Sequence, residues 1–318
     1  MKIGSHVSNN GNLMLVGSAL EALSYGSNCF MVYLGAPQNT YRKPFEQLNS
    51  LKMKEILQNN NINIEDVIVH APYIVNLAQP DFEKRKFAID LITKELQVMA
   101  KIGFKYLVIH PGAHMKNGID AGLDLIIDSF KQILANTKED NTVLTIETMA
   151  GKGSECCFEF SHIKKIINEV GSNRVGVCLD TCHIFDAGYD IVNDYDNVIN
   201  NFNDVVGLNN LKVIHINDSK NVCGSHKDRH ANFGFGNIGF DALIKFVYDE
   251  RFLSIPKILE TPYVNDCPPY KYEIEMIKNK LFDKYLLDKI SKEWLSWNRS
   301  LILQGWVVVR VVNVLIML

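Results

Sequence analysis

The sequence alternates short apolar stretches with longer amphipathic ones, and this alternation occurs eight times between residues 1 and 290. The short stretches predict β-strands centred near residues 3, 31, 69, 109, 145, 179, 214 and 259. Between them, apolar residues recur at helical spacing, as in residues 87–103, where Gly103 is placed to end the helix and one face carries Ile89, Ile92, Leu96 and Met99. Alternating strands and helices form parallel sheets, and eight such units predict an α/β fold closed into a (β/α)8 TIM barrel.

The domain organisation follows from the same pattern. An open, doubly wound sheet is the competing fold, but no G-x-G-x-x-G turn follows the first predicted strand. No linker or low-complexity segment divides the chain, so we expect one barrel domain over residues 1–285 and an atypical tail over residues 286–318. The tail is hydrophobic from residue 301, and it is short for a membrane span and carries Arg310 in its middle. We therefore favour an extra packed strand or helix, or a translated artefact, over a membrane anchor.

Composition restricts the class of protein and its compartment. Hydrophobic residues make up 47% of the chain and charged residues 22%, as in soluble globular proteins. The formal charge of -3 provides no general attraction to nucleic acid, so DNA binding would need a local basic patch or bound metal ions. The N-terminus lacks the apolar region of a secretory signal, and the seven cysteines show no CxxC pairing. We expect a cytoplasmic protein without disulfides.

Ligand-type side chains stand at the ends of six consecutive predicted strands, the third to the eighth. They are His70, His110, Glu147, Asp180 together with His183, His215 and Glu260. In a barrel these strand ends face the same mouth, so the side chains are expected to converge. Any one of them alone would be explained as a hydrogen-bonded structural residue. Together they would leave buried unpaired groups and mutual carboxylate repulsion, which divalent cations relieve.

The ligand types narrow the choice of metal. Histidines mixed with carboxylates, without a thiolate among them, favour zinc or manganese over an iron–sulfur cluster. The ring holds more ligands than one ion can use, which indicates a multinuclear site. Asp228 and His230, in the loop after the seventh strand, add a further pair whose i, i+2 spacing can turn both side chains to one side. With His183 they could form a separate three-ligand site.

Six segments carry a resemblance to a known family. In order along the chain they read HAPY, HPGAH, IETMAGKGSE, GVCLDTCHIFDAGYD, HINDSKNVCGSHKDRHANFGFGNIG and ILETPY. They closely resemble the endonuclease IV family of apurinic/apyrimidinic endonucleases, and the likeness runs from residue 1 to about residue 280. The resemblance implies a (β/α)8 barrel that holds three zinc ions, and all nine ligand positions of the family have counterparts here.

The resemblance also assigns the ligands to individual ions. The first zinc would be held by His70, His110 and Glu147; the second by Glu147 as a bridge with Asp180, His215 and Glu260; the third by His183, Asp228 and His230. The implied reaction is hydrolysis of the DNA backbone on the 5' side of an abasic site, which leaves 3'-hydroxyl and 5'-deoxyribose phosphate ends. Trimming of blocked 3' ends would follow at the same site. Glu147 is expected to orient or deprotonate the attacking water, because bound zinc lowers the pKa of water towards about 7.

Candidate DNA contacts come from three loops. Tyr73 and Ile74 resemble the wedge residues that the family inserts into the helix. The loop after the second strand carries Gln38 and Arg42, and Asn39 stands where some family members have an arginine, so that Arg42 is a candidate for the insertion role. Lys227 and Arg229 flank Asp228 and could meet phosphate oxygens. The expected partner is duplex DNA with abasic sites, bound by a monomer.

Two other functions remain in competition. A divalent-metal sugar isomerase or epimerase shares the barrel and the strand-end ligands, although its chemistry does not call for the Asp228/His230 pair. A non-catalytic DNA-lesion binder that keeps zinc for structure alone would be expected to have lost a bridging ligand, and none is lost.

Overall fold

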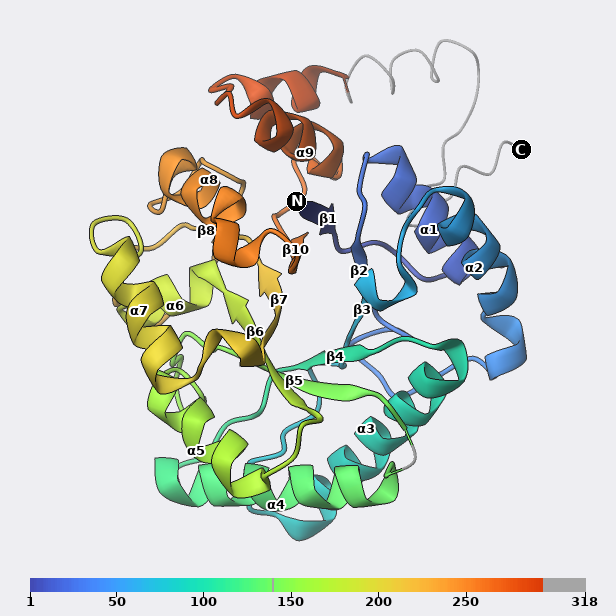
Figure 1. The fold of residues 1–318 in the computed structure, drawn as a ribbon, viewed down its shortest axis with the longest axis vertical. Helices are drawn as coiled ribbons and strands as arrows, with labels where there is room; N and C mark the ends of the chain where they lie inside the picture. The colour runs from blue at the N-terminus through green and yellow to red at the C-terminus, as the bar shows by residue number, and fades with distance from the viewer. Residues whose placement is uncertain (139, 294–318) are drawn as a thin grey trace.

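Eight parallel strands form the centre of the molecule in a computed structural model that describes residues 1–138 and 140–293. They are β1 (Lys2–Ser5), β2 (Phe30–Val32), β3 (Val67–His70), β4 (Tyr106–Ile109), β5 (Val143–Glu147), β6 (Val175–Asp180), β7 (Leu211–His215) and β10 (Pro256–Leu259). Their order in the sheet is β1-β10-β7-β6-β5-β4-β3-β2. A parallel bridge between His6 and Met31 joins β1 to β2 and closes the barrel. The predicted TIM barrel is confirmed (Figure 1).

Helices surround the ring of strands and cover its outer face (Figure 1). They are α1 (Leu15–Ser24), α2 (Ser50–Asn59), α3 (Phe82–Ile102), α4 (Ile119–Asn136), α5 (Phe160–Val170), α6 (Thr181–Ala187), α7 (Tyr195–Val205), α8 (Phe240–Tyr248) and α9 (Tyr270–Asn279). Most apolar side chains of the helices pack against the outward faces of the strands in one large core. The interior of the barrel has its own small cluster, formed by Cys29, Met31, Ile68, Val108, Cys178, Val213 and Ile258. The barrel is thus a packed core with its loops free to carry function.

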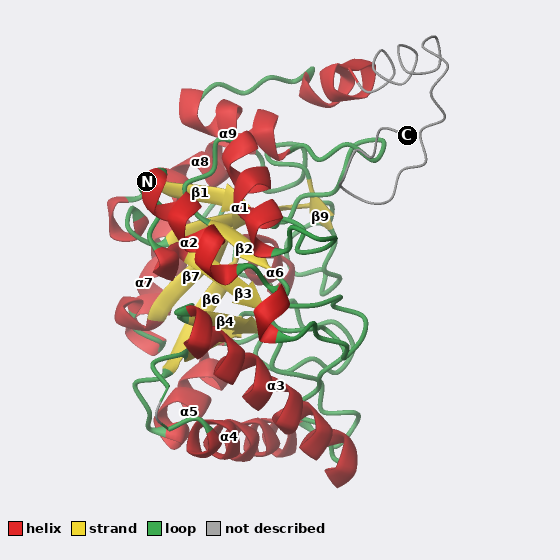
Figure 2. Ribbon diagram, turned by 90° about the vertical axis from the view of Figure 1, so that its right-hand side faces the viewer, coloured by secondary structure: helices red, strands yellow, loops and turns green. Residues whose placement is uncertain are grey.

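The predicted helix over residues 87–103 is longer than its apolar pattern indicated. It begins at Phe82, because the Asp81 side chain accepts a hydrogen bond from the backbone N–H of Lys84 and so caps the first turn. It ends at Gly103, whose φ of 93° lies in the left-handed region that favours glycine. A short antiparallel pair, β8 (Asp218–Ser219) with β9 (His230–Ala231), was not predicted. This pair lies on the side of the molecule where the loops at the carboxyl ends of the strands gather (Figure 2).

The chain continues after α9 with residues that still belong to the core. Leu286 and Ile290 are buried against it. The hydrophobic segment from residue 301, and with it the expectation about its role, lies outside the described residues. Among the residues that the structure describes, none of the helices is long and apolar enough to cross a membrane.

A buried carboxyl group ties α9 to two loops at the barrel mouth. Glu273 is fully buried and accepts hydrogen bonds from the Thr261 hydroxyl, the Asn232 amide and the Phe233 backbone N–H. Burial disfavours the charged form more than these hydrogen bonds favour it, which raises the pKa of Glu273 from 4.5 to about 7. The folded state therefore binds this proton more tightly than the unfolded chain does.

We expect this proton to make folding stability depend on pH. The contribution of Glu273 is complete below pH 4.5 and is lost as the pH rises through about 7. The variant Glu273→Gln cannot ionise, so between pH 4.5 and 8 the wild type should lose about 3 kcal/mol relative to it. Urea denaturation of both proteins at the two pH values measures this difference. Parallel stability profiles for the two proteins would contradict the assignment, and Glu65→Gln, at an exposed ion pair with Lys105, is the control.

Candidate metal centre

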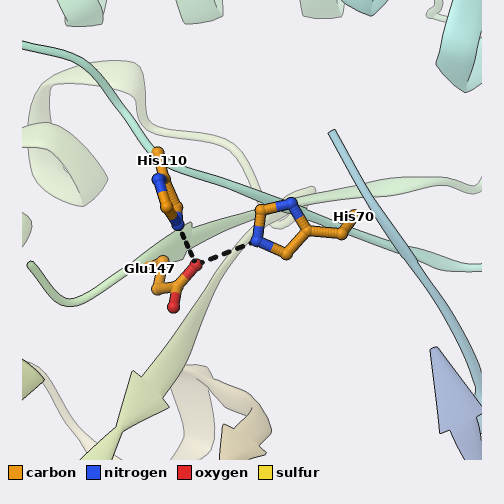
Figure 3. A group of neighbouring side chains, drawn as sticks. All are labelled: His70, His110 and Glu147. Atoms are coloured by element: carbon orange, nitrogen blue, oxygen red, sulfur yellow. Dashed lines mark hydrogen bonds and ion pairs between the residues drawn. The ribbon is translucent and has the colours of Figure 1, made fainter. Parts of the chain in front are cut away.

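Glu147, the last residue of β5, is the centre around which the strand-end residues gather. Its carboxylate is fully buried. One oxygen, Oε2, lies 3.1 Å from Nε2 of His70, at the end of β3, and 3.1 Å from Nε2 of His110, directly after β4 (Figure 3). One ligand atom from each of the three residues lies within 4.8 Å of the others, which is the spacing of ligands around a single cation. The rise of adjacent parallel strands puts these three side chains at one level.

The other oxygen of Glu147 faces a second group. Oε1 lies 3.0 Å from Nδ1 of His215, the last residue of β7. The same imidazole nitrogen lies 3.0 Å from Glu260 Oε2 and 3.8 Å from Asp180 Oδ2. Glu147, Asp180, His215 and Glu260 together meet the spacing of a four-ligand site. Because Glu147 belongs to both groups, its carboxylate is placed to bridge two cations.

A third group lies beside the second and combines α6 with the loop before β9. Nε2 of His183, in the first turn of α6, lies 3.2 Å from Asp228 Oδ1. Nε2 of His230, at the start of β9, lies 3.7 Å from the same oxygen. These three residues also meet the spacing of a metal site. The structure thus brings all nine residues of the predicted ligand set together in three groups.

Main-chain carbonyl groups orient three of the histidines. Nδ1 of His70 faces the carbonyl oxygen of Ala71, Nδ1 of His183 that of Thr148, and Nδ1 of His230 that of Glu260. A carbonyl oxygen only accepts hydrogen bonds, so each Nδ1 donates and each Nε2 keeps its lone pair for a cation. Nε2 of His230 is buried without a hydrogen-bond partner. This arrangement of the second ring nitrogen is typical of metal-binding histidines and shows that the residues present fit divalent cations.

The electrostatics of the groups also fit cations. Burial alone would raise the pKa of Glu147, but His215 and His110 hold it well below its ordinary value. Burial alone would lower the pKa of His183, but Asp180, Asp228 and Glu147 raise it well above its ordinary value. Protons on the imidazoles thus balance the buried carboxylates. A divalent cation provides the same balance and displaces those protons when it binds.

Three residues that sequence reasoning did not select support the ligands. The fully buried Asn217 donates from its amide nitrogen to Asp180 Oδ2 (2.7 Å) and accepts the backbone N–H of Glu260 (2.8 Å). The Thr148 hydroxyl accepts the backbone N–H of Asp180. Lys152 Nζ lies 3.5 Å from Asp228 Oδ2. Asn217 stands two residues after His215 in the segment HINDSKNVCG, a position that could have marked it as a second polar group at the same strand end.

The candidate DNA contacts lie on the mouth loops, with different degrees of freedom. Tyr73 and Ile74 are exposed, as are Gln38, Lys227 and Arg229. The guanidinium of Arg42, in contrast, forms an ion pair with the buried Glu95 of α3 and donates to the carbonyl oxygens of Asn39 and Tyr41. A contact between this guanidinium and DNA would require breaking the ion pair with Glu95.

Comparisons with known proteins agree with this geometry. A family model described as a xylose isomerase-like TIM barrel matches residues 20–280. The probable endonuclease 4 of Acholeplasma laidlawii (strain PG-8A) is 50% identical over 291 residues, which are 91% of this chain and 99% of that protein. The crystal structure of endonuclease IV from Thermus thermophilus has a TM-score of 0.76 at 25% identity and covers 88% of this chain and 98% of its own. A D-tagatose 3-epimerase-like protein has a TM-score of 0.65 at 16% identity over 92% of this chain and 99% of its own, a likeness of fold alone.

The separation of the third group from the other two leads to a prediction about metal content. Asp228→Ala removes a ligand that only the third group uses, so we expect the variant to hold one divalent cation fewer than the wild type while the other two stay bound. Metal analysis of both proteins after gel filtration, by mass spectrometry of the elements, measures the difference. Loss of every ion from the variant would count against independent groups.

Proposed function

The chain belongs to the endonuclease IV family, and from this membership we propose that it is a DNA repair enzyme of base excision that cleaves duplex DNA at abasic sites. The proposed reaction is hydrolysis of the phosphodiester bond on the 5' side of the abasic site, which leaves a 3'-hydroxyl and a 5'-deoxyribose phosphate. The same site would trim blocked 3' ends. The observation that carries the proposal is the convergence of nine histidine and carboxylate side chains in three groups at the barrel mouth.

We propose zinc, three ions per chain, as the cofactor. The groups contain only imidazole nitrogens and carboxylate oxygens at the proposed ligand positions, and the histidines among them are oriented by carbonyl groups. Zinc would supply a water activated near neutral pH and would neutralise charge on the phosphate. Residues His70, His110 and Glu147 would hold the first ion; Glu147, Asp180, His215 and Glu260 the second; His183, Asp228 and His230 the third.

The protein's own part in the reaction centres on Glu147. Its carboxylate faces imidazoles of both the first and the second group, so it can accept a hydrogen bond from a water held between them. It would thereby orient the attacking water towards the phosphorus atom or take up its proton. The surrounding residues exclude bulk water, since Glu147, Asp180 and His215 are fully buried. Full burial strengthens every electrostatic contact within the site.

The surface around the mouth fits a bound duplex. Large apolar side chains are exposed on the loops that follow several strands, at Leu13, Tyr41, Tyr73, Ile74, Met115, Val222 and Tyr263. These loops gather on one side of the molecule (Figure 2). Exposed apolar groups concentrated on one face indicate an interaction surface. Exposed Lys227 and Arg229 would contact backbone phosphates, and Tyr73 with Ile74 would occupy the space left by the missing base.

We place this activity in the barrel domain, residues 1–285, acting as a monomer in the cytoplasm. The decisive experiment is incision of a duplex oligonucleotide that carries one abasic site, with the undamaged duplex as the control. Nicking restricted to the abasic strand, with a 3' end that a polymerase extends, is the expected result. A folded protein loaded with zinc that does not nick either duplex would overturn the proposal, and ketoses would then be tested because epimerases share the fold.

Glu147→Gln tests the proposed catalytic role. Glutamine keeps the shape of the side chain but cannot accept a proton, so we expect incision to slow roughly 100-fold or more while binding of abasic DNA persists. Single-turnover incision and a gel-shift titration measure the two quantities. Glu65→Gln, the same change at an exposed ion pair before β3, should incise at the wild-type rate. Near-normal incision by Glu147→Gln would refute the role.

Tyr73→Ala tests the proposed wedge. Loss of an exposed aromatic ring that stacks in the helix should weaken binding of the abasic duplex about tenfold while metal content stays unchanged. Tyr285→Ala is a matched control, since both tyrosines are 57% exposed and Tyr285 follows α9 outside the mouth loops. Fluorescence anisotropy with labelled abasic duplex measures the affinity. Equal affinities of the two variants would show that Tyr73 does not act as the wedge.

A further inference from the structure

The carboxyl end of α6 is joined to the loop that carries Asp228. This loop, residues 220–229, connects β8 to β9 and will be called the 220–229 loop. The carbonyl oxygen of Phe185 accepts the backbone N–H of Gly224 (3.0 Å), and the carbonyl oxygen of Asp186 accepts that of His226 (2.9 Å). These carbonyl groups lie in the last turn of a helix, where they lack partners within the helix itself. The loop therefore satisfies the end of α6 and is held against it.

The Asp186 side chain makes the most specific contact with this loop. It is fully buried, and its Oδ2 accepts the backbone N–H of Asp228 (2.8 Å) and the side-chain amide of Asn221 (2.9 Å). Its Oδ1 accepts the hydroxyl of Ser219 (2.6 Å), at the end of β8. One carboxylate thus binds the start, the middle and the end of the segment that presents Asp228.

The backbone of the loop needs such support. His226 has a φ of 53° and Asp228 a φ of 58°, both in the left-handed region that non-glycine residues rarely adopt. Residues keep such conformations only where surrounding contacts impose them. The hydrogen bond from Asp228 N–H to Asp186 is a charge-assisted contact at the residue whose side chain faces His183 and His230.

Helix α6 therefore acts on the third group in two ways. His183, in its first turn, is one of the three ligands, and Asp186, one turn later, fixes the backbone of another. We propose that Asp186 is a positioning residue that sets the affinity of the third metal site by holding the 220–229 loop in its binding conformation. This inference rests on the proposed three-zinc centre and goes beyond it, since Asp186 does not belong to any of the ligand groups.

The variant Asp186→Asn removes the charge and keeps the size of the side chain. An amide offers one acceptor oxygen in place of two, so at least one of the donors from Ser219, Asn221 and Asp228 loses its partner inside the protein. Loss of a residue that supports a ligand typically weakens metal binding about 10- to 100-fold. We expect a change of this size at the third site, with the first two sites unaffected.

Zinc content as a function of buffered free zinc tests the inference without DNA. The wild type should load three ions per chain, and Asp186→Asn should load its last ion at about 10- to 100-fold higher free zinc than the wild type does. The matched control is Asp218→Asn. This second buried carboxylate holds the backbone N–H groups of Gly236 and Ile238 beyond β9, and it makes no hydrogen bond to Asp228. The control should melt at a lower temperature than the wild type but load all three ions at wild-type zinc concentrations.

Three results would overturn the inference. They are an unchanged third loading step in Asp186→Asn, an equal shift of all three steps, and the same selective shift in Asp218→Asn. Should Asp186→Asn fail to fold, Asn221→Ala removes one donor to the same oxygen and should weaken the third step alone by several-fold; an unchanged step would again refute the proposal. A wild type that loads only two ions would contradict the three-zinc centre itself, which separates failure of the proposed function from failure of the role of Asp186.

Discussion

The structure of the barrel mouth depends on one buried carboxylate surrounded by imidazoles. Glu147 is fully buried and lies within 3.4 Å of nitrogen atoms of four histidines, His70, His110, His183 and His215. A buried anion without partners costs several kcal/mol, and so do buried imidazolium ions. The groups are stable only as a neutral whole, in which protons or cations balance the carboxylates. Every strand end in this half of the barrel must therefore deliver a side chain of the correct sign to the correct position.

A layer of neutral hydrogen-bonding groups fixes those side chains in place. Carbonyl oxygens of Ala71, Thr148 and Glu260 orient three imidazoles, and the Asn217 amide joins Asp180 to the segment after β10. These groups carry no formal charge, so they orient the ligands without altering the charge balance. Most of them are parts of the backbone at strand ends, which the barrel itself holds rigid. Preorganisation of the centre is thus largely a consequence of the fold.

The sequence predicted the elements whose signals are local. The strand ends with His70, His110, Glu147, Asp180, His215 and Glu260 could be located because each ligand directly ends or follows an apolar stretch. The contacts of Asp186 with Ser219 and Asp228 could not be located in this way, since they join residues 33 and 42 positions apart in the chain. Their pairing depends on the path of the 220–229 loop over α6, which has no periodic pattern. The start of α3 at Phe82 was missed for a related reason, because the first turn is set by the polar cap Asp81 and not by apolar spacing.

The ion pair between Arg42 and Glu95 shows why charge alone does not identify a DNA contact. In the sequence only Arg42 is conspicuous, because it stands in a loop at the mouth. Glu95 is buried in α3, so withdrawal of the guanidinium would leave an unpaired buried carboxylate, which is costly. The guanidinium therefore braces the loop from behind, with hydrogen bonds to the carbonyl oxygens of Asn39 and Tyr41. Under the proposed function, the exposed side chains of Gln38, Asn39 and Tyr41 are the part of this loop that is free to meet a duplex, and Arg42 determines where they stand.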